Sequence, residues 1–578
     1  MKSRLSRHGV AREHLLLGLV MLLALAVRLW GIGFGLPNEH ARPDERHLIG
    51  FTLTMGGNRL NPGFFNYPSL YLYALLVCYG VYFAVGRVTG RFHSAQDLVA
   101  EYSIAPDAFY LIDRGLVAAL GTATVALVYW IVKQLLGVRA ALLAALFLAL
   151  SYLHVRDSHF GTVDVPLTFV ATLALAMIVR ARQASSARSN LLAGLLVGLA
   201  VSTKYNAVAL LAPLLWCQLL QLEAAQKSER LQRVLRWYLP ALVAIAVGFV
   251  LGTPYSVLDY ATFSRDVIYE LVDKGRSLPA LDLGPGWLYH ARVTLPHGVG
   301  LPLLLTALAG AVLWLRRDLR TALLLLGFPV AWYMGVGSSH YVFVRYVVPL
   351  APALCIFAAY AVERFTLFLE QRWGAGLRAR LLLALACSGL MVLPLYNVVQ
   401  WNRLVRLEDT RVLAADWIER NVPSGQTVGL MGPVYMRPDL WSTALQMQRA
   451  SAASNAQGRG LRNEMRIKHL ERTGAPSYET RAFQQGVWLD PLNPASPSAQ
   501  PPRYVVLAEH PAWVPEPGSV PVLSAEYTVV ASFSAFGQEA TSAVFDRHDA
   551  VYFPYARFAG VRRPGPNIRI FERQVVRP

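Results

Sequence analysis

Long apolar runs separated by short polar segments fill the first 398 residues of the chain. A helix that crosses a bilayer needs about 20 mostly apolar residues, and we predict that eleven of these runs cross a membrane. They cover residues 15–32, 111–135, 140–153, 165–179, 191–202, 207–222, 238–251, 299–315, 323–336, 347–362 and 381–396. A further apolar stretch, residues 69–85, is rich in tyrosine, and we expect an interfacial or re-entrant helix there.

Lys and Arg in the short loops set the expected orientation. The basic N-terminus (Lys2, Arg4, Arg7, Arg12) favours the cytoplasmic side, so residues 33–110 form the first outer loop. The short basic segment 133–139 should then face inside, which a full crossing by residues 69–85 would prevent. We therefore predict a multi-pass protein of the cytoplasmic (inner) membrane, with its C-terminal domain extracytoplasmic.

The pattern changes to that of a soluble domain at about residue 399. Residues 405–420 have the apolar spacing of an amphipathic helix, and four short runs rich in β-branched and aromatic residues predict strands. These runs are Thr427–Leu430, Arg503–Ala508, Tyr527–Ser532 and Asn567–Phe571. The predicted fold class is a polytopic α-helical membrane domain, residues 1–398, followed by a small α/β domain, residues 399–578.

Composition agrees with this pattern. The chain is 54% hydrophobic and only 16% charged, whereas a soluble protein carries about 25% charged residues. The net charge of +18 does not indicate nucleic-acid binding, because much of the Lys and Arg lies in loops between apolar runs. All four cysteines lie in apolar segments, so we expect no disulfide and no thiolate zinc site.

Ionisable side chains gather on the predicted outer side of the membrane. Charged groups at membrane depth are costly and mark substrate paths, although a single one is as easily an anchor at a helix end. The set comprises Asp44, Glu45, His47, Asp113, Arg114, His154, Arg156, Asp157, His159, Asp164, Lys204, Tyr205, Arg292, His297, His340, Tyr341, Arg345 and Tyr346.

This mixture suits transfer of a group from a lipid phosphate. Arg114, Lys204 and Arg345 have the charge to hold a phosphate leaving group, and a carboxylate such as Asp44 can take a proton from an acceptor hydroxyl or amine. Asp44 and Asp164 could instead share a divalent metal, the one cofactor we consider. The residues alone leave both alternatives open.

Several segments together resemble the GT-C membrane glycosyltransferases, in the branch of the protein O-mannosyltransferases and the lipid A aminoarabinose transferase. Asp44-Glu45 is similar to their Asp-Glu motif, and Asp113-Arg114 to a second-span entry whose arginine binds donor phosphate. Asp164 stands at an acidic position of their second outer loop. The other similar segments are 157–167, 203–207, 345–352 and 409–411. Where the lipid A branch has Lys-Pro-Pro, this chain has Asn66-Tyr67-Pro68.

The resemblance implies an inverting glycosyltransferase with a polyprenyl- or dolichyl-phosphate sugar donor and a lipid, glycan or protein acceptor. We predict Asp44, Glu45 and Asp164 as catalytic, and the substrate contacts as Arg114, Lys204, Tyr205, Arg345, His159 and Tyr341. One alternative is a transporter or flippase of a lipid-linked sugar, which would place ionisable groups or broken helices near the midplane. Another is a non-catalytic membrane anchor for the C-terminal domain.

Overall fold

The chain folds into two compact units whose segments alternate along the sequence. The first unit comprises Met1–Trp30, Met55–Leu76 and Arg114–Trp401, and the second comprises Gly31–Thr54, Val77–Asp113 and Asn402–Pro578. The computed structural model describes residues 2–273, 279, 281–374, 376–453, 457–484, 487–490, 493–498, 501–513, 523, 526–537, 542–549 and 552–574.

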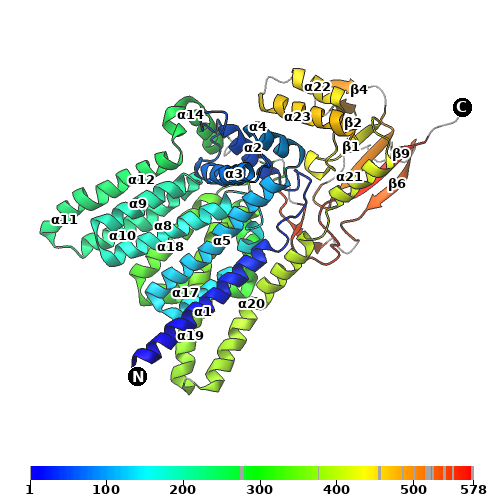
Figure 1. Ribbon diagram of the computed structural model, residues 1–578. Helices are drawn as coiled ribbons and strands as arrows, with labels where there is room; N and C mark the ends of the chain where they lie inside the picture. Colours follow the sequence, from blue (N-terminus) through cyan, green and yellow to red (C-terminus); the bar gives the residue numbers. More distant parts are fainter. Residues whose placement is uncertain are drawn as a thin grey trace. The chain divides into compact units, whose positions relative to one another are not determined.

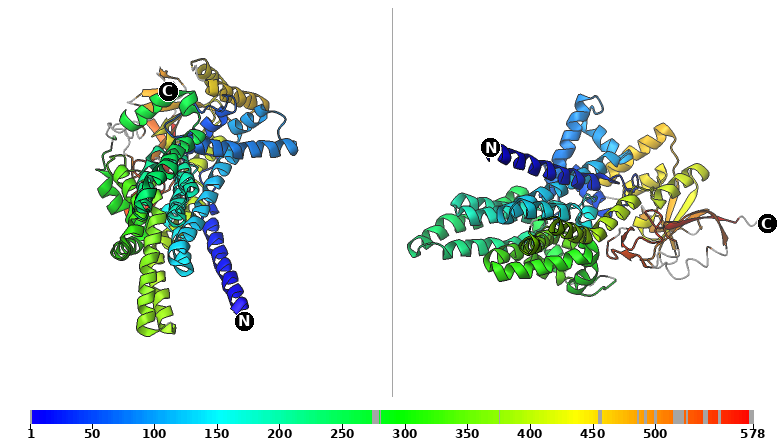
Figure 2. Two further views of the ribbon diagram at one scale, coloured as in Figure 1. Left: turned by 90° about the vertical axis from the view of Figure 1, so that its left-hand side faces the viewer. Right: turned by 90° about the horizontal axis from the view of Figure 1, so that it is seen from below.

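The first unit is built from helices, which lie alongside one another in Figures 1 and 2. Its principal helices are α1 (Lys2–Leu29), α6 (Val138–Ala149), α7 (Tyr152–Asp157), α8 (Asp164–Ala184), α9 (Ala187–Val201), α10 (Leu211–Glu223), α11 (Lys227–Arg233), α12 (Leu239–Gly252), α14 (Tyr260–Ile268), α17 (Leu301–Arg317), α18 (Leu319–Gly337) and α19 (Ala351–Trp373). Four further helices begin in one unit and end in the other: α2 (Pro43–Met55), α3 (Leu70–Val88), α5 (Asp107–Leu136) and α20 (Leu377–Val405).

All eleven runs predicted to cross the membrane contain helix, which confirms the polytopic helical fold. Over the described residues, nine helical segments are long and apolar enough to span a bilayer, and α6 and α9 are shorter apolar helices. One of the nine is α3, which covers residues 70–85 of the predicted interfacial stretch 69–85. The helix itself is therefore confirmed, while its interfacial position stays a prediction.

Glycines allow two of these helices to approach closely. A Cβ on Gly194 would lie 2.1 Å from the Ala241 carbonyl oxygen, and one on Gly198 would lie 2.1 Å from that of Ile245. From the facing helix, a Cβ on Gly248 would lie 2.3 Å from the Leu195 carbonyl oxygen. Helices α9 and α12 therefore pack backbone to backbone, as small residues permit in membranes.

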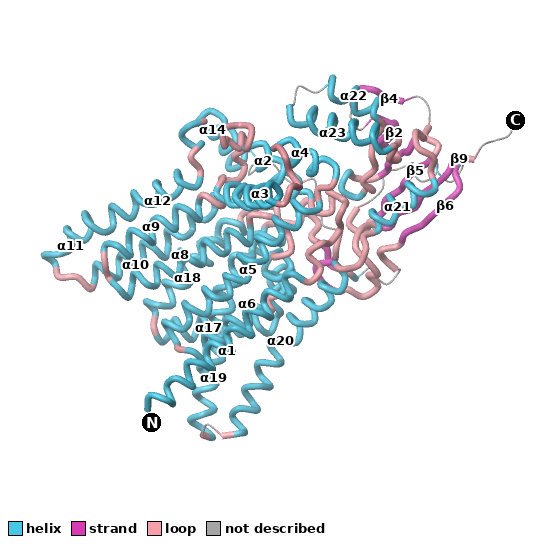
Figure 3. Tube along the Cα trace, viewed as in Figure 1, coloured by secondary structure: helices cyan, strands magenta, loops and turns pink. Residues whose placement is uncertain are grey.

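The second unit contains all the described strands, which Figure 3 shows in magenta. The strands are β1 (Thr427–Met431), β2 (Glu479–Gln484), β3 (Val487–Asp490), β4 (Asn493–Ser498), β5 (Tyr504–Glu509), β6 (Tyr527–Phe533), β7 (Val544–Phe545), β8 (Pro554–Ala556) and β9 (Asn567–Arg573). Seven form one sheet in the order β4-β3-β2-β1-β5-β9-β6, and β7 pairs with β8. Strand β1 is parallel to β2 and β5, and the outer pairs are antiparallel.

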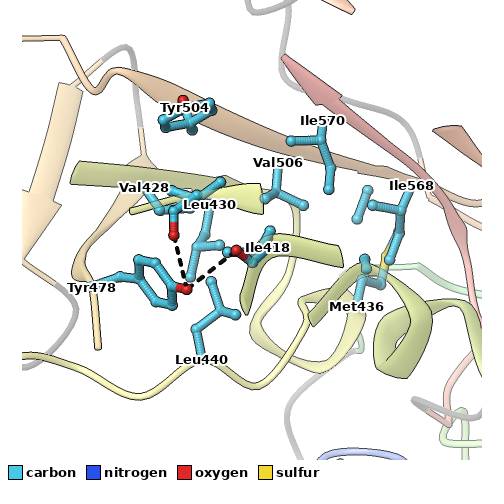
Figure 4. Packing of buried hydrophobic residues seen from close by; sticks show 13 residues of the cluster. Ile418, Val428, Leu430, Met436, Leu440, Tyr478, Tyr504, Val506, Ile568 and Ile570 are labelled. Carbon is cyan, nitrogen blue, oxygen red and sulfur yellow. Dashed lines mark hydrogen bonds between the residues drawn. The ribbon is translucent and has the colours of Figure 1, made fainter. Parts of the chain in front are cut away.

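The central strands bury both faces of this sheet. Along β5, Tyr504, Val506 and Ala508 join one apolar cluster and Val505 and Leu507 join another, as the two-residue period of a strand requires. Helix α21 (Thr410–Asn421) covers the first face with apolar residues four apart, Ala414 and Ile418. Figure 4 shows this face, where the Tyr478 hydroxyl donates to the Ile418 carbonyl at 3.2 Å.

The predicted α/β domain is thus confirmed, and four of its strands were predicted from the sequence. The helix predicted at residues 405–420 was wrong at its start, because α20 continues to Val405 and α21 begins at Thr410. Asp409 is the reason for the new start, since its carboxylate accepts the Arg411 N–H at 2.9 Å as an N-cap. The second unit also includes residues 31–54 and 77–113, with helix α4 (Ala95–Ile104) and most of α2 (Pro43–Met55). The predicted domain boundary at 398/399 stays a prediction.

Candidate functional site

Three of the predicted site residues meet around one carboxylate in the first unit. Lys204 donates to Asp164 Oδ1 at 2.7 Å, and Arg345 Nε lies 3.7 Å from Asp164 Oδ2. The Asp164 side chain is 2% exposed, that of Lys204 11% and that of Arg345 7%. Two cations therefore flank one carboxylate in a poorly solvated place, where both can attract an anion.

Local structure explains why these residues meet. Asp164 begins α8 and so lies at the positive end of a helix dipole. Lys204 is extended and immediately precedes a 3-10 turn, Tyr205–Leu210, and Arg345 lies in a second 3-10 turn, Val344–Leu350. Aromatic rings orient both cations: the Lys204 ammonium lies 4.7 Å from the Tyr346 ring centroid, and the Arg345 guanidinium lies 4.5 Å from that of Phe343.

A pocket opens beside this cluster. It encloses about 690 Å³ of empty space, part of it open to solvent, and Lys204, Tyr205 and Tyr341 are in its wall. The remaining lining residues are Asn66, Tyr67, Asn206, Glu270, Leu271, Gly335, Val336, Ser339 and Tyr346. The pocket wall therefore carries one ammonium, several phenols and amides, and one carboxylate. Such groups can bind a polar ligand that carries a phosphate.

Two other predicted contacts are buried away from solvent. Arg114, near the start of α5, and His159 are both fully buried. The His159 ring nitrogens face the carbonyl oxygens of Val155 at 2.9 Å and Trp30 at 3.1 Å. Burial lowers the pKa of His159 to about 4, so the ring is neutral at pH 7. This geometry gives His159 an internal bonding role, and its contact with substrate stays a prediction.

The acidic motif lies in the second unit, and it is not in a loop as the sequence predicted. Asp44 and Glu45 occupy the first turn of α2, after Pro43 at the first helical position. Proline suits that position, and carboxylates are stabilised there by the helix dipole. The two acids differ in access: the Asp44 side chain is 33% exposed, whereas Glu45 is fully buried. Of the two, Asp44 is the one that a substrate can reach.

Charged residues next to the motif are buried in ion pairs. Arg42 pairs with Asp549, and its guanidinium lies 3.8 Å from Asp44. Glu39 pairs with Arg462 and with Arg466, the latter at 3.0 Å. Burial opposes ionisation of Glu39, but Arg462, Arg466 and Arg46, the last at 3.4 Å, outweigh it, so the pKa of this carboxyl is lowered.

His40 lies between these pairs and is neutral at pH 7. Burial lowers the pKa of His40 to about 4, and Arg46 donates to its Nε2 at 2.8 Å. The surroundings of the acidic motif are therefore fixed by arginine–carboxylate pairs, with the imidazole as an acceptor.

The first unit does not fit a divalent metal at Asp164. Over the residues that the structure describes, no group of three or more His, Cys, Asp or Glu side chains is arranged to hold one. The Asp164 carboxylate already faces two cations, Lys204 and Arg345, which repel a dication. The predicted metal shared by Asp44 and Asp164 stays untested, and no chemical step here depends on it.

Sequence reasoning missed some residues of the pocket wall. The segment Asn66-Tyr67 was noted only for lacking the lysine of the lipid A branch, yet both residues line the pocket. Glu270 was passed over in a stretch interpreted as a long loop, and it accepts from Asn66 Nδ2 at 3.4 Å. The available signal was that this stretch carries acidic residues on the same predicted side as Lys204.

The overall fold is similar to that of a solved protein. Over 96% of this chain and 97% of the other, it matches ArnT from Cupriavidus metallidurans bound to undecaprenyl phosphate, with a TM-score of 0.52 and 14% identity. The apo state of the same ArnT matches with a TM-score of 0.51 and 14% identity over 97% of this chain and 98% of that one. No curated protein matches the sequence.

The chain thus shares the fold of ArnT, which agrees with the resemblance inferred from its motifs. Residues 114–253 match the family described as dolichyl-phosphate-mannose-protein mannosyltransferase. That segment contains five of the nine predicted site residues, namely Arg114, His159, Asp164, Lys204 and Tyr205.

Proposed function

We propose that this protein is an inverting glycosyltransferase that takes a sugar from a polyprenyl-phosphate donor on the outer face of the cytoplasmic membrane. One observation carries the proposal: Asp164 holds two cations together, and one of them, Lys204, lines a pocket of phenols and amides. Cations held in fixed positions in a poorly solvated wall stabilise the charge that grows on a departing phosphate. The undecaprenyl phosphate bound to the similarly folded ArnT supports this donor class.

In the proposed reaction the acceptor hydroxyl or amine attacks the anomeric carbon from the face opposite the phosphate. The bond from that carbon to the phosphate oxygen breaks, and its electron pair leaves on polyprenyl phosphate. Lys204, Arg345 and Arg114 stabilise the phosphate, and Asp164 positions Lys204 and Arg345. Tyr205 and Tyr341 contact the sugar.

Asp44 is the proposed base that takes the acceptor proton, and Glu45 orients it. The exposure of the Asp44 side chain supports its role as the base, since a buried carboxylate such as Glu45 has no access to an acceptor. A lipid, a glycan or a protein can supply the attacking group, because each carries hydroxyls or amines.

The test is release of polyprenyl phosphate by the purified full chain in detergent, with polyprenyl-phosphate sugars as donors and candidate acceptors added. Asp44→Asn should abolish release while leaving the protein folded. Asp416→Asn is the matched control, because Asp416 is also a partly exposed helical carboxylate that pairs with Arg420 at 3.2 Å. Full turnover by Asp44→Asn would remove Asp44 as the base.

The alternative hypothesis, a transporter or flippase, predicts a different result in the release assay. A flippase would move the lipid-linked sugar across proteoliposomes without releasing polyprenyl phosphate. Movement without release, from folded wild-type protein supplied with each acceptor class, would replace the enzyme proposal.

A further inference from the structure

Buried ion pairs hold the segment just before the acidic motif within the second unit. Before the motif, Glu39 is 2% exposed and pairs with Arg462 and Arg466 of α23 (Gln457–Thr473). Next to it, Arg42 is 1% exposed and pairs with Asp549, itself 7% exposed. The four-residue segment from Glu39 to Arg42 is thus fixed at both ends by side chains from beyond residue 450.

The α23 arginines reach more than the motif segment. They are four residues apart, so they lie on one face of the helix. Arg466 Nε donates to the Ser103 carbonyl of α4 at 2.9 Å, and the Arg462 guanidinium lies 5.2 Å from the Tyr102 ring centroid. Figure 1 shows α4 beside α23.

Arg42 connects the C-terminal residues to the proposed base. Its NH1 pairs with Asp549, and its NH2 lies 3.8 Å from Asp44 Oδ2. The guanidinium is planar and carries its donors in fixed directions. Asp549 holds one edge of the Arg42 guanidinium plane in place. It therefore also sets the direction in which the opposite edge faces Asp44.

We propose that the C-terminal domain positions the base of the reaction: Asp549 acts on Asp44 through Arg42, and Arg462 and Arg466 act on the same segment through Glu39. These are positioning residues, since none of them has to touch substrate. The inference rests on the proposed function. According to this inference, the C-terminal domain contributes to the rate of the chemical step by positioning Asp44.

The alternative is that these pairs only stabilise the fold. A structural role lowers the amount of folded protein and leaves the turnover of each folded molecule unchanged. A positioning role lowers kcat of folded protein and leaves KM for the lipid donor nearly unchanged, because the proposed phosphate contacts are other residues. Misplacing a reacting group by about 1 Å costs on the order of 100-fold in rate.

The experiment compares full-length wild type with Asp549→Asn, Asp549→Glu and Glu509→Gln in the release assay. Glu509→Gln is the matched control, because its pair with Arg569, at 2.9 Å, lies in the same sheet domain and away from the motif segment. Folded fraction is measured by thermal melting and gel filtration. We expect Asp549→Asn to lower kcat about 10- to 100-fold with KM changed less than about twofold. Asp549→Glu should recover part of kcat, and Glu509→Gln should match wild type.

A second variant covers the case in which Asp549→Asn does not fold. Arg466→Gln leaves Arg462 on Glu39 and should also lower kcat of the folded fraction. Wild-type kcat in either folded variant would overturn the positioning role, as would equal losses in Glu509→Gln. Absence of release by wild type with every donor would instead overturn the proposed function itself.

Discussion

Removing the Asp164 carboxylate should destabilise the first unit strongly. Asp164→Asn keeps the shape of the side chain but removes the negative charge that lies between Lys204 and Arg345. At an effective dielectric constant of about 20, unit charges 2.7 Å apart, the distance from Lys204 Nζ to Asp164 Oδ1, attract by about 6 kcal/mol. Part of this is offset by desolvation, and breaking a buried pair on one side costs about 3 to 5 kcal/mol. We expect a loss in that range.

A double-mutant cycle separates the ion pair from other effects of the substitution. Unfolding free energies would be measured in mixed micelles for Asp164→Asn, Lys204→Met and the double variant. Because Lys204→Met removes one of the two cations that Asp164 holds together, the double variant should be more stable than the sum of the single losses by about 1 to 3 kcal/mol. Glu229→Gln is the control, since Glu229, which pairs with Arg233 of the same helix at 2.9 Å, is 47% exposed, and such a pair contributes about 0.5 kcal/mol.

Additive losses in the cycle would refute the reasoning. They would mean that Asp164 and Lys204 do not act together, and the cluster could not be the preorganised phosphate contact proposed above. If Asp164→Asn lowered the free energy of unfolding no more than Glu229→Gln does, water would be screening the charges of Asp164, Lys204 and Arg345.

Two further predictions concern stability. His510 is surrounded by Phe536, Phe545 and Tyr552, its Nδ1 accepts the Ala512 N–H at 3.0 Å, and burial lowers its pKa to about 3. In the unfolded state His510 has a pKa of about 6.5 and binds a proton below that pH, whereas the folded state does not. The contribution of neutral His510 to the free energy of unfolding is therefore fully present above pH 6.5 and is lost as the pH falls toward 3. The loss should be about 2 kcal/mol between pH 7 and 5, and melting curves of His510→Gln should show a shallower slope over that interval; equal slopes would contradict the assignment. Gly198→Ala should cost about 1 to 3 kcal/mol, because its Cβ would meet the Ile245 carbonyl at 2.1 Å. Gly389→Ala in α20 meets nothing within 4 Å and should be neutral or stabilising in the same melting assay.

The membrane helices were predictable because each carries its own signal. An apolar run of sufficient length is helical in a bilayer whatever its neighbours are, so residues 165–179 and 347–362 could be located from local sequence. Strands such as β5 could also be located from local sequence, because their apolar residues pack on both faces of the sheet. The first turn of α2 was missed although Pro43, Asp44 and Glu45 are typical of a helix start, because the motif was interpreted by its chemistry alone.

The partners of the site residues could not be predicted in this way. Lys204 follows Asp164 by 40 residues, and no spacing rule connects residues that far apart. The pairing of Glu39 with Arg462 and Arg466 depends on α23, a basic polar helix that resembles any solvated surface element. Charge type and predicted side of the membrane identified candidates, and only the fold decided which of them pair.

The pairing of Glu39 with Arg462 has a consequence for synthesis of the chain. The two residues are separated by 423 positions, and a ribosome adds about 5 to 20 residues per second. Glu39 therefore emerges about 20 to 80 s before its arginine exists, with several membrane helices inserted in the interval. During that time the segment that carries Asp44 lacks the partners that fix it. A nascent chain stalled before residue 462 should therefore expose this segment to protease, and release of the finished chain should protect it.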